Sequence, residues 1–313
     1  MHATGMTMSW TTKDIPNQAG RLAIVTGANA GLGYETALAL AGAGAEVIVA
    51  ARDPDKGQAA VKRILAAHPG ATVRLELVDL ARLADVAAFA ERIAARHERL
   101  ELLVNNAGLM TPPRRQMTPD GFEMQFGVNY LAHFALTARL LPLLRRGDQS
   151  RVVSLSSGAH NMGQIRLDDL NLSRGYRAWL GYSQSKLAML MFALELDRRS
   201  RAGGWGIMSN AAHPGLARTD IFAGRPWNGS ALARMTQALS PFLSQSAADG
   251  ALPQLYAATS PDAVGGGYYG PGGLFELAGP PKAAAVASKA GDLAVATRLW
   301  EASETLTGVK FPT

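Results

Sequence analysis

Short apolar runs alternate with stretches of helical periodicity from residue 21 onward, and this alternation constrains the fold more than any other feature of the chain. The apolar runs predict strands over residues 22–26, 46–51, 73–78, 100–105, 151–156 and 208–212. The helical stretches predict helices over 30–43, 54–68, 83–97, 122–144, 182–200 and 293–305. Strands that alternate with helices in this way form a parallel sheet with helices on both faces. We therefore predict an α/β fold, a Rossmann-like doubly wound parallel sheet.

No internal repeat, low-complexity linker or change of composition divides the 313 residues. We expect an N-terminal extension over 1–20, with Trp10 as its anchor on the body, followed by a single domain over 21–313. An irregular stretch with prolines and aromatic residues predicts a loop or lid over 216–245. A glycine-rich stretch predicts a short late strand within 265–270.

The composition is that of a globular protein, with 48% apolar and 18% charged residues. The absence of cysteine excludes disulfides and thiolate metal sites and is compatible with a reducing compartment. The six histidines include no His-x-x-x-His pair, so we expect no metal site. The start of the chain lacks a signal-peptide pattern, and no apolar run approaches the ~20 residues of a spanning helix. We expect a soluble, cytoplasmic protein that does not bind membranes.

The chain carries 31 Lys and Arg against 25 Asp and Glu, a formal net charge of +6. The basic residues are scattered in short pairs, which favours solvated faces, with attraction of an anionic cofactor as the alternative. No basic run with interleaved aromatic residues indicates nucleic-acid binding. The expected partner is a small molecule, and a homo-oligomer is left open.

A glycine-rich loop, TGANAGLG over residues 26–33, directly follows the first predicted strand. Glycine lets the backbone approach a pyrophosphate, and the N-terminus of the next helix supplies N–H groups and a positive dipole. The spacing differs from the usual G-x-G-x-x-G, and an ordinary glycine-rich turn is the alternative. Its position after the first strand favours nucleotide binding, with candidate cofactor residues Gly27, Asn29, Gly31, Leu32 and Gly33.

The end of the second strand bears on the choice of nucleotide. An acidic residue about 20 positions after the glycines would bind the ribose of NAD, whereas an arginine would bind the 2′-phosphate of NADP. The chain has Arg52 followed by Asp53, and Asp53-Pro54 is typical of a helix N-cap with proline at the first helical position. We therefore expect NADP, with NAD as the less favoured alternative.

Tyr182 and Lys186 lie four residues apart in a predicted helix, so their side chains share one face. A free tyrosine has a pKa of about 10 and is a poor proton relay near neutrality. A cation at roughly 4 Å would lower that pKa by around three units and make Tyr182 a usable general acid and base. This spacing also arises by chance, so its weight depends on the rest of the chain.

Four motifs, taken in order, resemble those of the short-chain dehydrogenase/reductase family. They are TGANAGLG, Asn105-Asn106-Ala107-Gly108 after the fourth strand, Ser156-Ser157 at the end of the fifth, and Tyr182 with Lys186. The resemblance covers roughly residues 20–220. It implies an oxidoreductase that moves a hydride between a nicotinamide cofactor and a carbonyl or secondary alcohol carbon.

The resemblance implies four catalytic residues. Ser157 would hydrogen-bond the substrate oxygen, with Ser156 as the adjacent alternative. Tyr182 would exchange the proton, and Lys186 would lower its pKa and hold the nicotinamide ribose. Asn129 would order a water of the proton relay beside the lysine.

The resemblance also implies the cofactor residues. The three loop glycines would hold the pyrophosphate, and Asp79, with its neighbour Leu80, would meet the adenine. The alternative role of Asp79 is to cap the next helix. The set is completed by Tyr182, Lys186, Asn106, Ala107, Gly108, Pro214, Gly215 and Thr219.

Tyr182 follows Ser157 by 25 residues, a longer gap than in the shortest family members. The insert over 160–181 resembles that of the retinol-dehydrogenase and protochlorophyllide-reductase branch, which also carries TGANxGLG. Many animal members of that branch have a membrane anchor, which we do not expect here. The resemblance does not make the substrate a retinoid.

We therefore predict an NADP-dependent oxidoreductase acting on CH–OH or C=O groups of a small molecule, with a hydrophobic substrate suggested by the apolar lid. The alternatives are a non-catalytic module that senses NADP(H) and a reductase of carbon–carbon double bonds. Of the histidines, we expect His133 in the core, His213 bracing the turn before Pro214, and His160 as a candidate lining residue of the substrate pocket.

Overall fold

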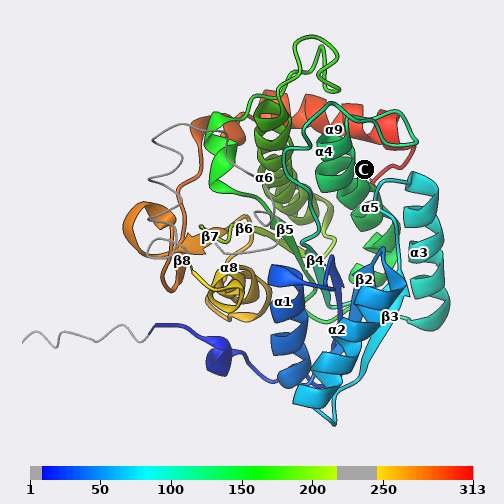
Figure 1. Cartoon of the computed structure of the whole chain (residues 1–313), viewed down its shortest axis with the longest axis vertical. Helices are drawn as coiled ribbons and strands as arrows, with labels where there is room; N and C mark the ends of the chain where they lie inside the picture. The colour runs from blue at the N-terminus through cyan, green and yellow to red at the C-terminus, as the bar shows by residue number, and fades with distance from the viewer. Residues whose placement is uncertain (1–8, 217–244, 313) are drawn as a thin grey trace, which may run out of the picture.

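The computed structural model describes residues 9–216 and 245–312, and its centre is an eight-stranded sheet (Figure 1). The strand order is β3-β2-β1-β4-β5-β6-β7-β8, and neighbouring strands run parallel from β3 to β7. This order confirms the predicted doubly wound sheet. The strands are β1 Leu22–Thr26, β2 Glu46–Ala51, β3 Val73–Leu77, β4 Leu102–Asn105, β5 Arg151–Leu155, β6 Met208–Ala212, β7 Tyr268–Pro271 and β8 Pro281–Ala283.

The last strand departs from the all-parallel prediction. β8 pairs antiparallel with β7, and Tyr269 lies opposite Ala283. The connection between these strands is too short for the crossover that a parallel pair needs, so the chain returns as a hairpin. The late strand predicted within 265–270 is β7, which begins only at Tyr268 because Gly265 and Gly266 form a turn.

Helices cover both faces of the sheet, as predicted. On one face lie α1 (Gly31–Gly42), α2 (Pro54–Ala67) and α8 (Ala247–Thr259); on the other lie α3 (Leu83–Arg96), α5 (Ala132–Leu144) and α6 (Ala178–Gly203), with α9 (Leu293–Thr307) outside them. Alternate strand residues enter opposite cores, since Leu22 and Ile24 pack with the second group of helices and Ala23 and Val25 with the first. The sequence did not predict α8.

Two helix boundaries differ from the sequence prediction. α6 begins at Ala178, four residues before the expected start at Tyr182. The helix expected over 122–144 consists of α4 (Met124–Phe126), a π-helical turn η2 (Gly127–Leu131) and α5. In that turn the Ala132 N–H bonds to Gly127 O, five residues back, and such π-turns are frequent at functional sites.

The described part of the N-terminal extension contacts the body. The Trp10 ring packs edge-on against Tyr256 of α8, with ring centroids 5.4 Å apart. A 3-10 turn, η1 (Thr12–Asp14), follows it. The lid expected over 216–245 lies outside the described residues apart from its two ends. None of the helices in 9–216 and 245–312 is long and apolar enough to cross a membrane.

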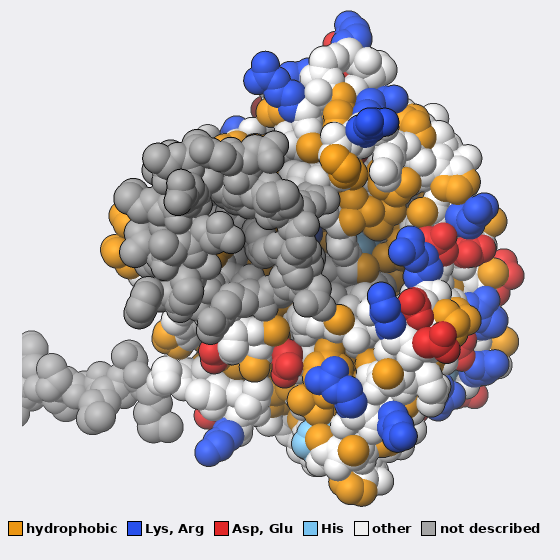
Figure 2. All heavy atoms as spheres, viewed as in Figure 1, with side chains coloured by type: hydrophobic (Ala, Val, Ile, Leu, Met, Phe, Trp, Pro, Cys, Tyr) orange, Lys and Arg blue, Asp and Glu red, His pale blue; other side chains and the backbone are white. Residues whose placement is uncertain are grey.

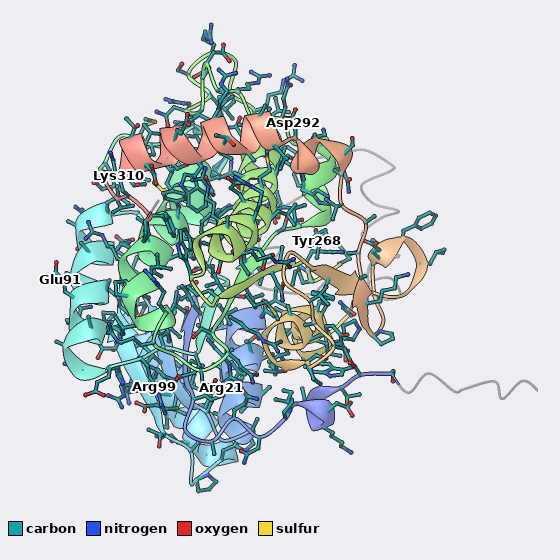
Figure 3. All side chains as sticks on the ribbon, turned by 180° about the vertical axis from the view of Figure 1, so that it is seen from behind. Arg21, Glu91, Arg99, Tyr268, Asp292 and Lys310 are labelled. Carbon is teal, nitrogen blue, oxygen red and sulfur yellow. The ribbon has the colours of Figure 1, made fainter. Side chains whose placement is uncertain are left out.

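The end of the chain closes the outer face of α5 and α6. α9 begins with Asp292 as its N-cap, and Lys310 follows its end (Figure 3). The Phe311 ring packs against Phe134, Trp205 and Trp300 at centroid distances of 5.1, 5.9 and 4.5 Å. Residues close to the C-terminus therefore belong to the core.

Phe311→Ala is expected to destabilise the protein by about 3–5 kcal/mol, because it leaves a cavity between buried aromatic rings. Urea unfolding of the purified variant measures this free energy. Leu306→Ala, at an exposed position on α9, is the matched control and should lie within about 0.5 kcal/mol of wild type. Equal losses in the two variants would show that the C-terminal segment does not pack as described.

Candidate active site

A cleft lies at the carboxyl ends of β1 and β4, where the chain leaves the sheet toward opposite faces. Two cavities of about 630 and 210 Å³ meet in it at Gly108. The larger is lined by residues including Leu32, Asn106, Ser157, Tyr182, Lys186, Pro214 and Gly215. The smaller is lined by residues including Gly27, Asn29, Arg52, Asp79, Leu80 and Ala107. The fold thus brings together most of the site residues that the sequence predicted. Gly31, Gly33 and Asn129 line neither cavity, and Thr219 lies outside the described residues.

The glycine loop fits a pyrophosphate. Gly27 has a φ of +67°, and a Cβ on Gly33 would lie 2.5 Å from both Asn106 Nδ2 and Gly27 O. The residue that caps α1 is Ala30, whose side chain cannot accept a hydrogen bond from the first turn. Asn106 Oδ1 is buried and has no hydrogen-bond partner among the described residues. Close backbone, helix N–H groups and a spare acceptor suit a dinucleotide.

The Thr26 hydroxyl connects the two sides of this cleft. It accepts the N–H groups of Asn106 and Ala107 at 2.9 Å each and lies 2.9 Å from His133 Nε2. His133 Nδ1 lies 2.8 Å from the Asn129 carbonyl oxygen, so Nδ1 carries the ring proton and Nε2 accepts from Thr26. Burial lowers the pKa of His133 to about 4, which keeps the ring neutral in this tautomer. His133 is the core histidine that the sequence predicted.

Asn129 lies in the π-helical turn, and its side chain is occupied by neighbours. Its Oδ1 accepts the Leu109 N–H at 2.8 Å, and its Nδ2 donates to Leu109 O and to Ser185 Oγ at 3.0 Å each. The side chain therefore holds Leu109 in the wall of the larger cavity. Its expected part in a proton relay stays a prediction.

The two adjacent serines point to different partners. Ser156 Oγ donates to Lys186 O at 2.8 Å and so fixes α6 against β5. The Ser157 hydroxyl lowers the pKa of Tyr182, and it also accepts the Ala159 N–H at 3.2 Å. The geometry therefore favours Ser157 as the serine that faces the tyrosine.

The electrostatics of Tyr182 and Lys186 differ from the expectation. Burial raises the pKa of Tyr182, and the Ser157 hydroxyl only partly offsets this rise. Burial also lowers the pKa of Lys186 to about 8. Lys186 Nζ donates to Leu155 O at 2.9 Å and lies 5.8 Å from the centre of the Tyr182 ring. In the protein without cofactor the pKa of Tyr182 therefore lies above its ordinary value, opposite to the predicted direction, because loss of solvent dominates.

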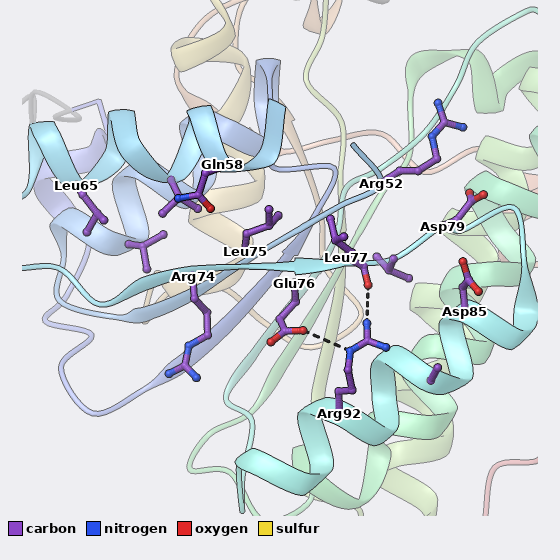
Figure 4. Close-up of a pocket in the computed structure, with 14 residues that line it drawn as sticks. Arg52, Gln58, Leu65, Arg74, Leu75, Glu76, Leu77, Asp79, Asp85 and Arg92 are labelled. Carbon is purple, nitrogen blue, oxygen red and sulfur yellow. Dashed lines mark hydrogen bonds and ion pairs between the residues drawn. The ribbon is translucent and has the colours of Figure 1, made fainter. Parts of the chain in front are cut away.

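The adenine end of the cleft bears on cofactor choice. Arg52 is exposed, and Figure 4 shows Arg52 and Asp79 past the carboxyl ends of β2 and β3. Asp53 Oδ1 accepts the Lys56 N–H at 3.0 Å, which confirms its predicted role as the N-cap of α2. Asp79 Oδ1 accepts the Ala81 N–H at 3.0 Å, so it caps a turn and still borders the cleft. Farther out, over α3, acidic and basic side chains are interspersed (Figure 2).

Several lining residues escaped the sequence analysis. The Trp179 ring lies 5.6 Å from that of Tyr182, and its place three residues earlier on α6 was the signal that could have revealed it. The others come from loops far apart in the sequence, which no local pattern links: Met110, Thr111, Phe275, Glu276 and Leu277.

The structure confirms the predicted role of His213 but not that of His160. His213 accepts the Gly215 N–H at Nδ1, 3.3 Å away, which confirms that it braces the turn before Pro214. His160 is not among the described residues that line the cavity, although Ala159 and Asn161 are. Its ring turns away to bond Ser157 O at 2.7 Å and to pack edge-on against Tyr268.

Residues 21–227 match the model of the family described as short chain dehydrogenase. Human retinol dehydrogenase 13 is 42% identical over 299 residues, which cover 94% of this chain and 86% of that protein. Two solved structures have a similar fold.

A crystal structure of an uncharacterized protein from Mycobacterium paratuberculosis is 40% identical, with a TM-score of 0.80 over 98% of this chain and all of that one. The RhlG protein of Pseudomonas aeruginosa, solved as an active-site complex with NADP, is 26% identical with a TM-score of 0.63. That match covers 80% of this chain and 94% of RhlG.

Lys186→Met is expected to stabilise the unliganded protein at pH 7. A lysine pKa of about 8 in the fold, against an ordinary 10.5, means that the unfolded chain binds more protons between these values, so stability rises with pH there. At pH 7 the buried ammonium lowers the free energy of unfolding by roughly 3 kcal/mol, and its hydrogen bond to Leu155 O raises it by about 1 kcal/mol. The variant should gain about 1–2 kcal/mol at pH 7, and the gain should shrink toward pH 10.

Urea unfolding across this pH range measures the gain. Lys310→Met, at an exposed position, is the control and should show no such pH dependence. A Lys186→Met variant less stable than wild type at pH 7 would contradict the buried-ammonium account.

Proposed function

The chain belongs to the short-chain dehydrogenases, in the retinol-dehydrogenase branch, and from this premise we propose that it interconverts a hydrophobic alcohol and its carbonyl compound with NADP(H). The observation that carries the proposal is the placement of the Tyr182 and Ser157 side chains in the wall of one cavity. Both hydroxyls border the larger cavity together with Lys186, next to the glycine loop that suits a dinucleotide.

The reaction assigns a task to each of these side chains. A bound nicotinamide supplies or accepts the hydride. The raised pKa of Tyr182 keeps its hydroxyl protonated at neutral pH, so it can donate a proton to a carbonyl oxygen. Ser157 can hydrogen-bond that same oxygen as negative charge develops on it. Lys186 is mostly charged below pH 8 and lies close enough to stabilise the tyrosinate that remains.

The preference for NADP rests on Arg52. This exposed guanidinium follows β2 at the edge of the smaller cavity, while the neighbouring carboxylate of Asp53 is engaged in capping α2. A cation in this place suits a 2′-phosphate, and a carboxylate there would suit the free ribose hydroxyl. The bound NADP of the RhlG complex is consistent with this preference.

The hydrophobic substrate rests on the wall of the larger cavity. Apolar side chains dominate it, including Met110, Trp179, Phe275 and Leu277. Glu276 is the only carboxylate among the described lining residues and is engaged by His213 and Ala285, so the wall offers little to a cationic substrate. The name of the human relative, a retinol dehydrogenase, refers to an alcohol of this apolar kind.

Tyr182→Phe should lower the reduction of apolar aldehydes and ketones by NADPH about 10²–10⁴-fold, because the proton donor is lost while the ring remains. Steady-state oxidation of NADPH with a panel of such carbonyls measures the change, and fluorescence titration checks that NADPH still binds. Tyr256→Phe on α8 is the matched control and should keep full activity. Turnover that survives Tyr182→Phe would contradict the mechanism. Tight NADPH binding by wild type without turnover of any carbonyl would favour the sensor instead.

Arg52→Ala should weaken NADPH binding about tenfold or more and leave NADH binding within about twofold, because a charge-assisted contact is lost only with the phosphate. Equilibrium titration with both cofactors tests this. Lys62→Ala removes the same charge from an exposed position on α2 and should change neither affinity. Equal effects on the two cofactors would refute the assigned preference.

A further inference from the structure

The turn after β6 is held against the loop of the β7–β8 hairpin by a group of contacts that we call the turn clamp. Its members are His213, Leu216, Gln245, Glu276 and Leu277. His213 Nε2 lies 3.0 Å from Glu276 Oε2, and the Leu216 N–H donates to Leu277 O at 2.8 Å. The Gln245 side chain donates to Pro214 O at 2.7 Å and accepts the Gly279 N–H at 3.2 Å.

Hydrogen bonding fixes the state of the His213 ring. Nδ1 accepts the Gly215 N–H, so the proton resides on Nε2 and is donated to Glu276. The ring is buried against β7, where Gly270 leaves the necessary room, since a Cβ at that position would lie 1.9 Å from His213 Nε2. One side chain therefore connects the turn, the strand and the hairpin loop.

Glu276 is held as firmly as its partner. Its Oε1 accepts the Ala285 N–H at 3.0 Å, while Oε2 accepts from His213. Phe275 and Glu276 have φ values of +52° and +56°, a left-handed conformation that two successive non-glycine residues keep only when tertiary contacts impose it. Such a conformation is typical of ligand clamps.

The backbone of the turn after β6 packs closely against the loop of the β7–β8 hairpin. Gly215 has a φ of +60°, and a Cβ on it would lie 2.4 Å from Leu277 O and 2.8 Å from Glu276 O. Pro214 and Gly215 line the larger cavity together with Tyr182 and Lys186. A shift of the hairpin loop would therefore move the cavity wall beside the reacting groups.

We propose that His213 and Glu276 are positioning residues, which set the place of the Pro214-Gly215 turn and, through it, the alignment of the nicotinamide with the substrate carbon. The proposal rests on the proposed function, because it concerns the same cavity. Misalignment of reacting atoms lowers kcat far more than it changes substrate affinity.

The test compares His213→Asn and Glu276→Gln with wild type. Asparagine places its amide oxygen near the Nδ1 position, so it can still accept the Gly215 N–H, but it cannot reach Glu276. Glutamine at 276 cannot accept from both His213 and Ala285. Glu304→Gln is the control for the loss of one carboxylate. Glu304 accepts two N–H groups, from Trp300 and Phe311, both at Oε1, which the glutamine oxygen can replace, and the residue does not line the cavity.

Three readouts are expected to change together. Amide hydrogen exchange at Leu216, measured without cofactor, should accelerate about tenfold in both clamp variants and not in Glu304→Gln. The Kd for NADPH should rise about fivefold, and kcat should fall about tenfold with a KM for the carbonyl substrate that stays within about twofold. The double variant should lose no more activity than the more impaired single variant, because both substitutions break the same contact.

Wild-type exchange at Leu216 together with an unchanged Kd and kcat in Glu276→Gln would overturn the proposal. This variant decides the matter even if His213→Asn fails to fold, since Glu276 is only half-buried. A wild-type protein that binds neither NADPH nor NADH would overturn the proposed function instead. The exchange measurement needs no cofactor, so in that case it still supports or overturns the clamp.

Discussion

The Thr26 hydroxyl lies at the end of β1 and hydrogen-bonds both to the chain leaving β4 and to the helix behind it. Two backbone N–H groups of Asn106 and Ala107 donate to it, and it donates to the neutral ring of His133, which in turn donates to Asn129 O. Asn129 then fixes Leu109 through both atoms of its amide. The glycine loop, the wall of the cavity and the π-helical turn thus hold their relative places through one buried hydrogen-bond network.

Burial of Lys186 beside the reacting tyrosine lowers the stability of the fold. Lys186 is buried against Leu155 O, and the described residues provide no carboxylate beside it. The pKa of Tyr182 moves in the direction that disfavours its anion, so burial works against the charged form of both side chains. Local violations of the rules that stabilise a core are expected at functional sites.

Much of this architecture could be predicted from sequence, because strand and helix periodicity is local and the motifs fall at the ends of predicted strands. The start of α6 at Ala178, the π-turn around Asn129 and the antiparallel β8 could not, since each depends on contacts between distant segments. The direction of the Tyr182 pKa shift could not be predicted for a related reason. Spacing placed the lysine on the same helix face but could not show how deeply both groups are buried or that Nζ turns toward Leu155 O.

The hairpin loop divides two tasks between adjacent residues. Glu276 faces inward and is fixed at both oxygens, whereas Phe275 also borders the cavity but leaves 82% of its side chain exposed, and Leu274 before it leaves 79%. Side chains at 274 and 275 can therefore vary without disturbing the turn that their neighbour holds. A lineage of such enzymes could change the alcohols it accepts at Phe275, which borders the cavity, while the residues behind it stay the same.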